Sequence, residues 1–388
     1  MKLAEDAAGF FIPSINLFGI GAHKEIGREI KLFGAKRPLI VTDEGLVNAG
    51  IVNELTNIIK KDSLVDISIY DKVHPNPTDK DVDAGLKIYK ESHCDMIITI
   101  GGGSSHDCGK GIGLLATNGG RIHDYEGIDK SKKAMPPFIA VTTTSGTASE
   151  MTRFCIITDS SRKVKMAIVD RNVTPNVSII DPILMKGMPK GLTAATGMDA
   201  LTHAVEAYVS TAANPITDAC ALKAISLISE NLRSAYANGD DMLARDNMAY
   251  AQYLAGMAFN NASLGYVHAM AHQLGGFYDL PHGVCNAILL PHVERFNLIS
   301  KVSRFVNIAI AMGQSIGYLS DRDAAEKAIE AIEKLSMDVG IPEGLSKLSV
   351  KKEDFRAMAE NAMKDACGLT NPRIPSIDDV IKIYDNAY

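Results

Sequence analysis

MIITI, residues 96–100, is followed by GGGSS, residues 101–105, and then by a helical stretch that begins at Asp107. A short β-branched run of this kind predicts a buried parallel strand, and the glycines indicate a tight strand-to-helix turn. Glycines at such a turn let backbone N–H groups approach a pyrophosphate, whose negative charge a helix N-terminus favours. The spacing is not the GxGxxG dinucleotide fingerprint. A turn that merely requires positive φ therefore remains the alternative.

Strand and helix patterns alternate on both sides of this stretch. Further buried strands are predicted at Pro38–Thr42, Phe138–Thr142 and Val177–Ile180, and amphipathic helices at Val47–Lys61 and Asp79–Ser92. This βαβ order predicts a doubly wound, Rossmann-like parallel sheet with helices on its faces. The pattern holds as far as about residue 187.

Strand signals stop at about residue 188, and helical spacing takes over. It occurs in the segments 193–209, 215–236, 241–258, 264–274 and 321–338. A chain of 388 residues exceeds the size that one core usually reaches. We therefore predict an α/β domain over residues 1–187 and an α-helical domain over residues 188–388. A ligand is expected in the cleft between them.

Composition excludes several classes of function. The net charge of −6 and the lack of a Lys/Arg cluster argue against a nucleic-acid surface. Six cysteines without a CxxC pair favour reduced thiols and a cytoplasmic protein. The apolar run Ala7–Ile12 follows Glu5 and Asp6 and is interrupted by Pro13, so no signal peptide or membrane span is expected.

Polar residues follow two of the predicted strands. Asp43 comes after PLIVT, where a carboxylate can accept hydrogen bonds from ribose hydroxyls and repel a 2′-phosphate. This favours NAD over NADP, although Asp43-Glu44-Gly45 would also make a good turn. The hydroxyl-rich segment 142–147, TTTSGT, follows another strand and is expected at the same edge of the sheet.

Two pairs of possible metal ligands lie four residues apart in the second half. Asp199 and His203 form one pair, His268 and His272 form the other, and His282 follows. Residues at i and i+4 share a helix face, so each pair can aim at one point. Carboxylate and imidazole ligands without thiolate suit a divalent ion such as Fe(II) or Zn(II). Any one of these histidines could instead be a hydrogen-bonded core residue, but burying so many imidazoles without partners is costly.

Four motifs carry a resemblance to a known family. They are GGGSSHDCGK (101–110), TTTSGTASEMT (142–152), GMDALTHAVEAY (197–208) and HAMAHQLGGFYDLPHGVCNAILLPHV (268–293). With them the chain resembles the iron-containing (group III) alcohol dehydrogenases over nearly its whole length. It looks most similar to the subgroup of NAD-dependent methanol and 1,3-propanediol dehydrogenases.

The resemblance implies a dehydroquinate synthase-like architecture, with a dinucleotide-binding N-terminal domain and a helical domain that holds one divalent ion, Fe(II) before Zn(II). It implies Asp199, His203, His268 and His282 as ligands, with His272 as a neighbouring proton relay. Spacing alone does not make this choice, because His268 and His272 share a face. Gly275-Gly276 are expected to end the preceding helix, so that His282 reaches the metal from the start of another helix.

The resemblance also implies NAD as cofactor. The glycine loop would contact the pyrophosphate, Lys165 would lie near the ribose or nicotinamide, and Asp43 would select NAD. The residues expected along the cofactor are Asp43, Gly102, Gly103, Ser104, Asp107, Lys110, Thr143, Thr144, Thr147 and Lys165.

The implied activity is interconversion of short primary alcohols or diols and aldehydes by hydride transfer, in a dimer or a ring of dimers. Phe154, Phe259 and Cys367 either narrow the substrate pocket or belong to the core. A lyase resembling dehydroquinate synthase is one alternative. It would need several cations beside the metal, and residues 191–282 hold only Lys223, Arg233 and Arg245. A non-catalytic metal-binding protein is the other alternative.

Overall fold

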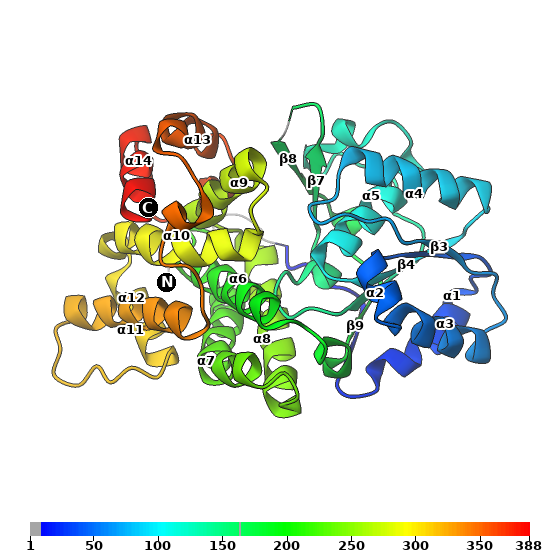
Figure 1. Ribbon diagram of the computed structural model, residues 1–388, viewed down its shortest axis with the longest axis horizontal. Coiled ribbons are helices and arrows are strands. Elements are labelled where there is room, and N and C mark those ends of the chain that lie inside the picture. The colour runs from blue at the N-terminus through cyan, green and yellow to red at the C-terminus, as the bar shows by residue number, and fades with distance from the viewer. Residues whose placement is uncertain (1–8, 163) are drawn as a thin grey trace.

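A computed structural model describes residues 9–162 and 164–388 (Figure 1). Its main sheet has six strands, all parallel, in the spatial order β1-β9-β6-β4-β2-β3. In chain order the strands are β1 (Ile15–Phe18), β2 (Pro38–Val41), β3 (Ser68–Tyr70), β4 (Met96–Gly101), β6 (Phe138–Thr142) and β9 (Val177–Ile180). The chain leaves β2 for the edge strand β3 and then crosses back to β4. The sheet order therefore reverses between β2 and β4, which is where such sheets bind ligands.

Helices cover both faces of this sheet. On β2, Ile40 faces a core formed with α1 (Ile26–Phe33) and α3 (Ile51–Asp62). Its neighbours Leu39 and Val41 face the opposite core, with α4 (Asp79–Glu91) and α5 (Gly103–Asn118). This alternation follows from the two-residue period of a strand. The predicted doubly wound α/β fold is confirmed.

A smaller sheet was not predicted from the sequence. It consists of β5 (Gly127–Ile128), β8 (Val164–Val169) and β7 (Phe154–Asp159), in that spatial order. β7 and β8 pair antiparallel, without the crossover helix that marks βαβ units. Figure 1 shows these two strands standing between the main sheet and the helical half.

From residue 190 onward the described chain is helical, as expected. Its helices are α6 (Lys190–Val209), α7 (Pro215–Ala237), α8 (Met242–Ala262), α9 (Tyr266–Tyr278), α10 (His282–Asn297), α11 (Val302–Ala311), α12 (Asp321–Asp338), α13 (Phe355–Ala362) and α14 (Ile377–Asn386). They share one large core. α6 is buried along nearly its whole length, which explains why it carries few charged residues.

Three sequence expectations about helix ends were wrong. The helix expected over Val47–Lys61 is divided into α2 (Glu44–Asn48) and α3, because Gly50 has a φ of 80°. α5 begins at Gly103 rather than Asp107. Gly275-Gly276 do not end α9, which continues to Tyr278. A Cβ at Gly275 would lie 3.2 Å from Cε of Lys165, so the glycine makes room for a side chain from β8.

The segment before β1 reaches the helical half. Phe11 exchanges backbone hydrogen bonds with the side chains of Asn260 and Asn261 in α8. Ala7 and Ala8 of the apolar run Ala7–Ile12, and Glu5 and Asp6 before it, lie outside the described residues. In the part of the chain that is described, no helix is both long and apolar enough to cross a membrane. The domain boundary at residue 187 stays a prediction.

Candidate active site

The glycine loop opens a cavity at the carboxyl edge of the main sheet. Gly102 precedes the 16-residue helix α5 and offers no side-chain cap, so the first N–H groups of α5 are free to meet an anion. A Cβ on Gly103 would lie 2.9 Å from the side chain of Thr147, so only glycine allows the two segments to approach this closely. The cavity has a volume of about 600 Å³, and its lining includes Asp43, Glu44, Gly102, Gly103, Ser104, Thr144 and Thr147.

Asp43 lies beside the point where the sheet order reverses. Its Oδ1 accepts a hydrogen bond from the backbone N–H of Leu46 at 3.0 Å and so caps α2. The same residue lines the cavity. The turn interpretation and the nucleotide interpretation of this residue are therefore compatible.

Asp107 and Lys110 hold the segment that follows β6. The Lys110 ammonium group is buried and donates to Oγ of Ser149 at 3.0 Å and to the carbonyl oxygens of Thr152 and Phe154 at 3.0 and 2.6 Å. Asp107 accepts from Oγ of Ser149 at 2.6 Å. Burial lowers the pKa of Lys110 and raises that of Asp107. Lys110 thus holds this segment against α5.

Among the residues expected along the cofactor, two lie behind the cavity walls. Lys110 and Thr143 are buried and line neither this cavity nor the one described next. Thr143 donates its backbone N–H to the carbonyl of Gly101 at 2.9 Å. Both residues support the walls of the cavities that the other residues line.

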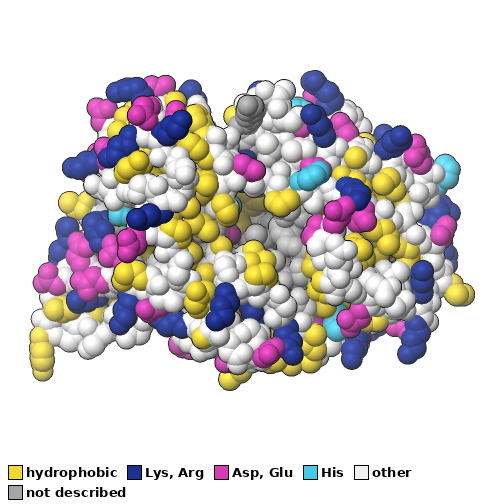
Figure 2. Space-filling model, in the orientation of Figure 1, with side chains coloured by type: hydrophobic (Ala, Val, Ile, Leu, Met, Phe, Trp, Pro, Cys, Tyr) yellow, Lys and Arg dark blue, Asp and Glu magenta, His cyan; other side chains and the backbone are white. Residues whose placement is uncertain are grey.

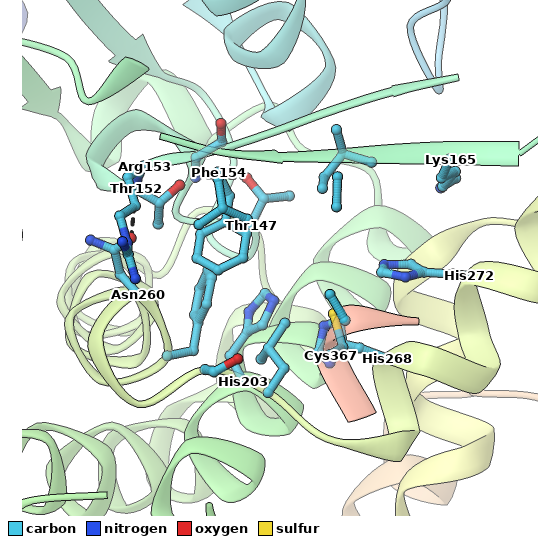
Figure 3. Close-up of a pocket in the computed structure, with 18 of the residues that line it drawn as sticks. Thr147, Thr152, Arg153, Phe154, Lys165, His203, Asn260, His268, His272 and Cys367 are labelled. Atoms are coloured by element: carbon cyan, nitrogen blue, oxygen red, sulfur yellow. Dashed lines mark hydrogen bonds between the residues drawn. The ribbon is translucent and has the colours of Figure 1, made fainter. Parts of the chain in front are cut away.

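A second cavity, of about 440 Å³, lies between the two halves, where Figure 2 shows a hollow in the surface. It shares Gly103, Ser104 and Thr147 with the first cavity, so the two meet at the N-terminus of α5. The lining also includes Asp107, Phe154, Lys165, Asp199, His203, Phe259, His268, His272, His282 and Cys367. Figure 3 shows Phe154 and His203 on one side of this space and His272, Lys165 and Cys367 on the other.

Three of the predicted metal ligands converge on one point of this cavity. Nε2 of His268 lies 3.9 Å and Nε2 of His282 lies 3.7 Å from Oδ1 of Asp199. Each of the three atoms lies within 4.8 Å of the other two. Burial lowers the pKa of His268 to about 3 and that of His282 well below its usual value. Both imidazoles are therefore neutral, which is the form that coordinates a cation.

The fourth predicted ligand, His203, lies beside this group. Its Nε2 is 4.0 Å from Oδ1 of Asp199, and its ring stacks on that of His268 with centroids 4.7 Å apart. Burial lowers the pKa of His203 to about 4. Phe259 covers the other face of this ring at 4.2 Å, and Phe154 follows at 5.7 Å from Phe259. Two aromatic rings thus wall the cavity next to the predicted metal ligands.

These four side chains fit a divalent cation. Two donors that each lie about 2.1 Å from a tetrahedral ion are about 3.4 Å apart. The separations of 3.7 to 4.0 Å from Asp199 need to contract by only a few tenths of an ångström. One carboxylate and three neutral imidazoles present lone pairs that no cationic side chain of the described residues contacts, and all but the part-exposed His282 are buried. That donor set suits Fe(II) or Zn(II).

Glu206 orients one of the ligands and was missed in the sequence. Nδ1 of His268 lies 2.5 Å from Oε2 of Glu206, whose Oε1 accepts from the N–H of Val267 at 2.7 Å. When the ring donates Nδ1–H to Glu206, the lone pair on Nε2 faces Asp199. Glu206 lies seven residues after Asp199 on α6, so helical spacing could have identified it.

His272 stands next to the cluster and has a carboxylate partner of its own. Its Nδ1 lies 2.8 Å from Oδ2 of Asp365, and its ring stacks on His282 with centroids 5.5 Å apart. Burial alone would raise the pKa of Asp365. The charge and hydrogen bond of His272, with the N–H of Cys367, outweigh burial and lower it to about 2. Asp365 is therefore ionised at neutral pH. Asp365 was missed in the sequence, because it lies 93 residues from His272.

Lys165 connects the two halves across the cavity. Its Nζ donates to Oδ1 of Asn76 at 2.9 Å, and Nδ2 of Asn76 donates to Oδ1 of Asp279 at 2.9 Å. Asp279 lies at the end of α9, so this chain of contacts joins β8 to the helical half. Burial lowers the pKa of Lys165.

Comparisons with known proteins agree with this architecture. Residues 13–182 match the family described as "Iron-containing alcohol dehydrogenase", and residues 193–388 match "Fe-containing alcohol dehydrogenase family, C-terminal". The chain is 53% identical to 1,3-propanediol dehydrogenase of Klebsiella pneumoniae, covering 98% of each chain. It is 50% identical to NAD-dependent methanol dehydrogenase of Bacillus methanolicus, covering 97% of this chain and 99% of that one. A crystal structure of a 1,3-propanediol oxidoreductase superposes with a TM-score of 0.97 at 52% identity, covering 99% and 100% of the two chains.

A doubly wound sheet beside a helical bundle, with an Asp/His cluster between them, indicates a class of metal-dependent enzymes that bind a nucleotide. The chain belongs to the iron-containing alcohol dehydrogenase family. The alcohol dehydrogenase activity implied by the resemblance is confirmed at the level of the family, and the comparisons favour it over the lyase and the non-catalytic protein.

Proposed function

We propose that this protein interconverts short primary alcohols or diols and their aldehydes with NAD(H) and one divalent ion, Fe(II) before Zn(II). The observation that carries the proposal is the cluster of Asp199, His268 and His282 in a cavity that continues to the N-terminus of α5. The methanol and 1,3-propanediol dehydrogenases named above support an alcohol of this size.

The cation would be held by Asp199, His203, His268 and His282. When bound, such an ion supplies Lewis acidity that lowers the pKa of an alcohol, and the nicotinamide supplies the hydride acceptor. The free N–H groups of α5 and the hydroxyls of Ser104, Thr144 and Thr147 suit the diphosphate of the cofactor. Lys165 and Asp107 line the part of the cleft between that diphosphate and the cation cluster.

The remaining chemistry falls to the side chains of this cavity. Asp365 holds Nδ1 of His272, which leaves Nε2 free to take the proton that the alcohol loses. Phe154 and Phe259 exclude water from one wall and limit the length of the substrate. Among the described residues, the cations that line the cavity are Lys165 and Arg153, and both come from the sheet half. Lys165 is already hydrogen-bonded to Asn76, so the cavity is poorly suited to the acidic substrate of the lyase.

An alcohol panel tests this function. We expect purified protein of measured metal content to oxidise methanol, ethanol, butanol or 1,3-propanediol with NAD and to reduce the matching aldehyde with NADH. Activity should follow the fraction of chains that carry the ion. Absence of turnover with every alcohol and aldehyde in metal-loaded protein would contradict the proposal.

Asp43→Asn is expected to shift cofactor preference towards NADP. The carboxylate at the cavity wall repels a 2′-phosphate, and its removal should raise kcat/KM for NADP by about 10- to 100-fold. Asparagine is chosen because it still accepts the hydrogen bond from Leu46, whereas alanine would also remove the helix cap. Steady-state kinetics with both cofactors provide the measurement, and an unchanged NADP/NAD ratio would place Asp43 away from the ribose.

Three further proposals concern the whole protein. We propose a division into residues 1–187 and 188–388, which the positions of β9 and α6 support. Cytoplasmic localisation is supported by six cysteines that are all free and buried. A homo-oligomer, either a dimer or a ring of dimers, is proposed from the resemblance to the family.

A further inference from the structure

Asn286 contacts all three members of the tight ligand group, which we define as Asp199, His268 and His282. It lies on α10, one turn after His282, and is fully buried. Its Nδ2 lies 2.7 Å from Oδ1 of Asp199, 3.1 Å from Nε2 of His268 and 3.1 Å from Nε2 of His282. These are the three atoms that would coordinate the cation. The sequence signal for Asn286 is the same i, i+4 spacing that relates the other pairs.

The amide of Asn286 has more acceptors near its nitrogen than it has hydrogens, and its oxygen has no donor among the described residues. An amide nitrogen carries two hydrogens, yet three acceptors surround it. Its Oδ1 is buried and meets no hydrogen-bond partner in the described part of the chain. Buried polar atoms are rarely left without partners unless the site has a further role. The side chain is therefore held by the ligand cluster and not by a network of its own.

The contacts suggest what the amide does. Three electron-rich atoms brought together without a cation repel one another, and a donor placed between them reduces that repulsion. Once the imidazole nitrogens coordinate an ion they no longer accept hydrogen bonds. The carboxylate of Asp199 still has lone pairs to accept from Nδ2. The same amide can thus orient Asp199 with and without the ion.

We propose that Asn286 is a positioning residue of the metal centre, which holds Asp199, His268 and His282 convergent and thereby sets the affinity for the divalent ion. The inference rests on the proposed metal site. It assigns Asn286 no contact with substrate and no proton transfer. Loss of such a supporting contact typically lowers metal affinity by about 10- to 100-fold.

Cobalt(II) binding to full-length, metal-stripped protein provides the test, because the ion reports both affinity and coordination. The variants are Asn286→Leu, which keeps the branched shape and removes the donors, and Asn286→Asp, which replaces the amide with a second carboxylate. Asn297→Ala is the matched control. Asn297 is also a buried amide of α10, but it bonds to Glu294 and Asn371 and to none of the proposed ligands.

For Asn286→Leu we expect a Kd for cobalt about 10- to 100-fold above wild type, measured by chelator competition, and altered visible absorption bands of the bound ion. For Asn286→Asp we expect a lower Tm than wild type without metal and a larger rise in Tm on adding cobalt, because the ion relieves carboxylate repulsion. Asn297→Ala should lower Tm while leaving the Kd and the spectrum unchanged.

The outcomes separate two failures. A wild-type protein that binds no cobalt, or binds it equally well with Asp199→Ala, overturns the proposed metal site itself. If wild type binds cobalt through Asp199 but Asn286→Leu keeps the same Kd and spectrum, the role of Asn286 is wrong. Should Asn286→Leu not fold, an Asn286→Asp protein with the thermal shift of wild type overturns the inference equally.

Discussion

Asp199→Ala is expected to purify without its divalent ion and to lose alcohol oxidation. Asp199 is the one carboxylate in the tight ligand group, and its Oδ1 is the atom from which the three imidazole nitrogens lie 3.7 to 4.0 Å. Its removal leaves three neutral imidazoles and no carboxylate among the proposed ligands to balance the charge of a cation. We expect less than about a tenth of an ion per chain and a kcat/KM lowered at least about a thousandfold. Elemental analysis and steady-state kinetics measure these.

Thr202→Val is the matched control for this variant. Thr202 is a buried polar residue of the same helix, but its hydroxyl donates to the carbonyl of Met198 within α6. Metal content and turnover should therefore stay near those of wild type. Full occupancy by the ion in purified Asp199→Ala would mean that the ligand set is wrong, whatever the activity of the variant.

His272→Ala is expected to retain the ion and to lose most of its turnover. Asp365 fixes the ring through Nδ1, so that Nε2 can accept the proton released by the alcohol. General base catalysis of this kind contributes about 10²- to 10⁴-fold, and we expect kcat to fall within that range. Elemental analysis and steady-state kinetics of the purified variant measure the two quantities.

Two further variants test whether the loss of turnover in His272→Ala reflects proton transfer by this side chain. Asp365→Asn should also lower kcat, because the ring keeps its place but loses the carboxylate that fixes its tautomer. Gln273→Ala is the control, since the side chain of Gln273 bonds only to the carbonyl of Ala269 in the turn before it. Loss of the metal in His272→Ala would make His272 a ligand and not a proton acceptor.

Local sequence patterns were sufficient to predict strands that are buried on both faces. Met96–Ile100 and Val177–Ile180 are central strands covered on both faces, so their continuous apolar runs predicted them well. The antiparallel pair β7 and β8 was missed, because Phe154–Asp159 is buried on alternate residues only and no helix separates it from its partner.

Glycines were the least reliable signals. Gly50 divides a predicted helix because its φ is positive, whereas Gly275 and Gly276 lie inside α9 without ending it. The difference comes from the tertiary environment: Lys165 packs over Gly275, where a larger side chain would meet it. A sequence shows that a glycine is present, but not whether the chain uses it for a turn or for close packing.

The sequence by itself predicted the α/β-then-α order of elements, five candidate metal ligands and the loop at the N-terminus of α5, because spacing along a helix or strand fixes which side chains share a face. The choice of four ligands among the five came from the resemblance to the family. Tertiary structure alone brought His282 and Asn286 of α10 against Asp199 of α6, and Asp365 against His272. These contacts join residues that are 83 to 93 positions apart in the sequence. They depend on how whole helices pack around one core, which no local repeat encodes.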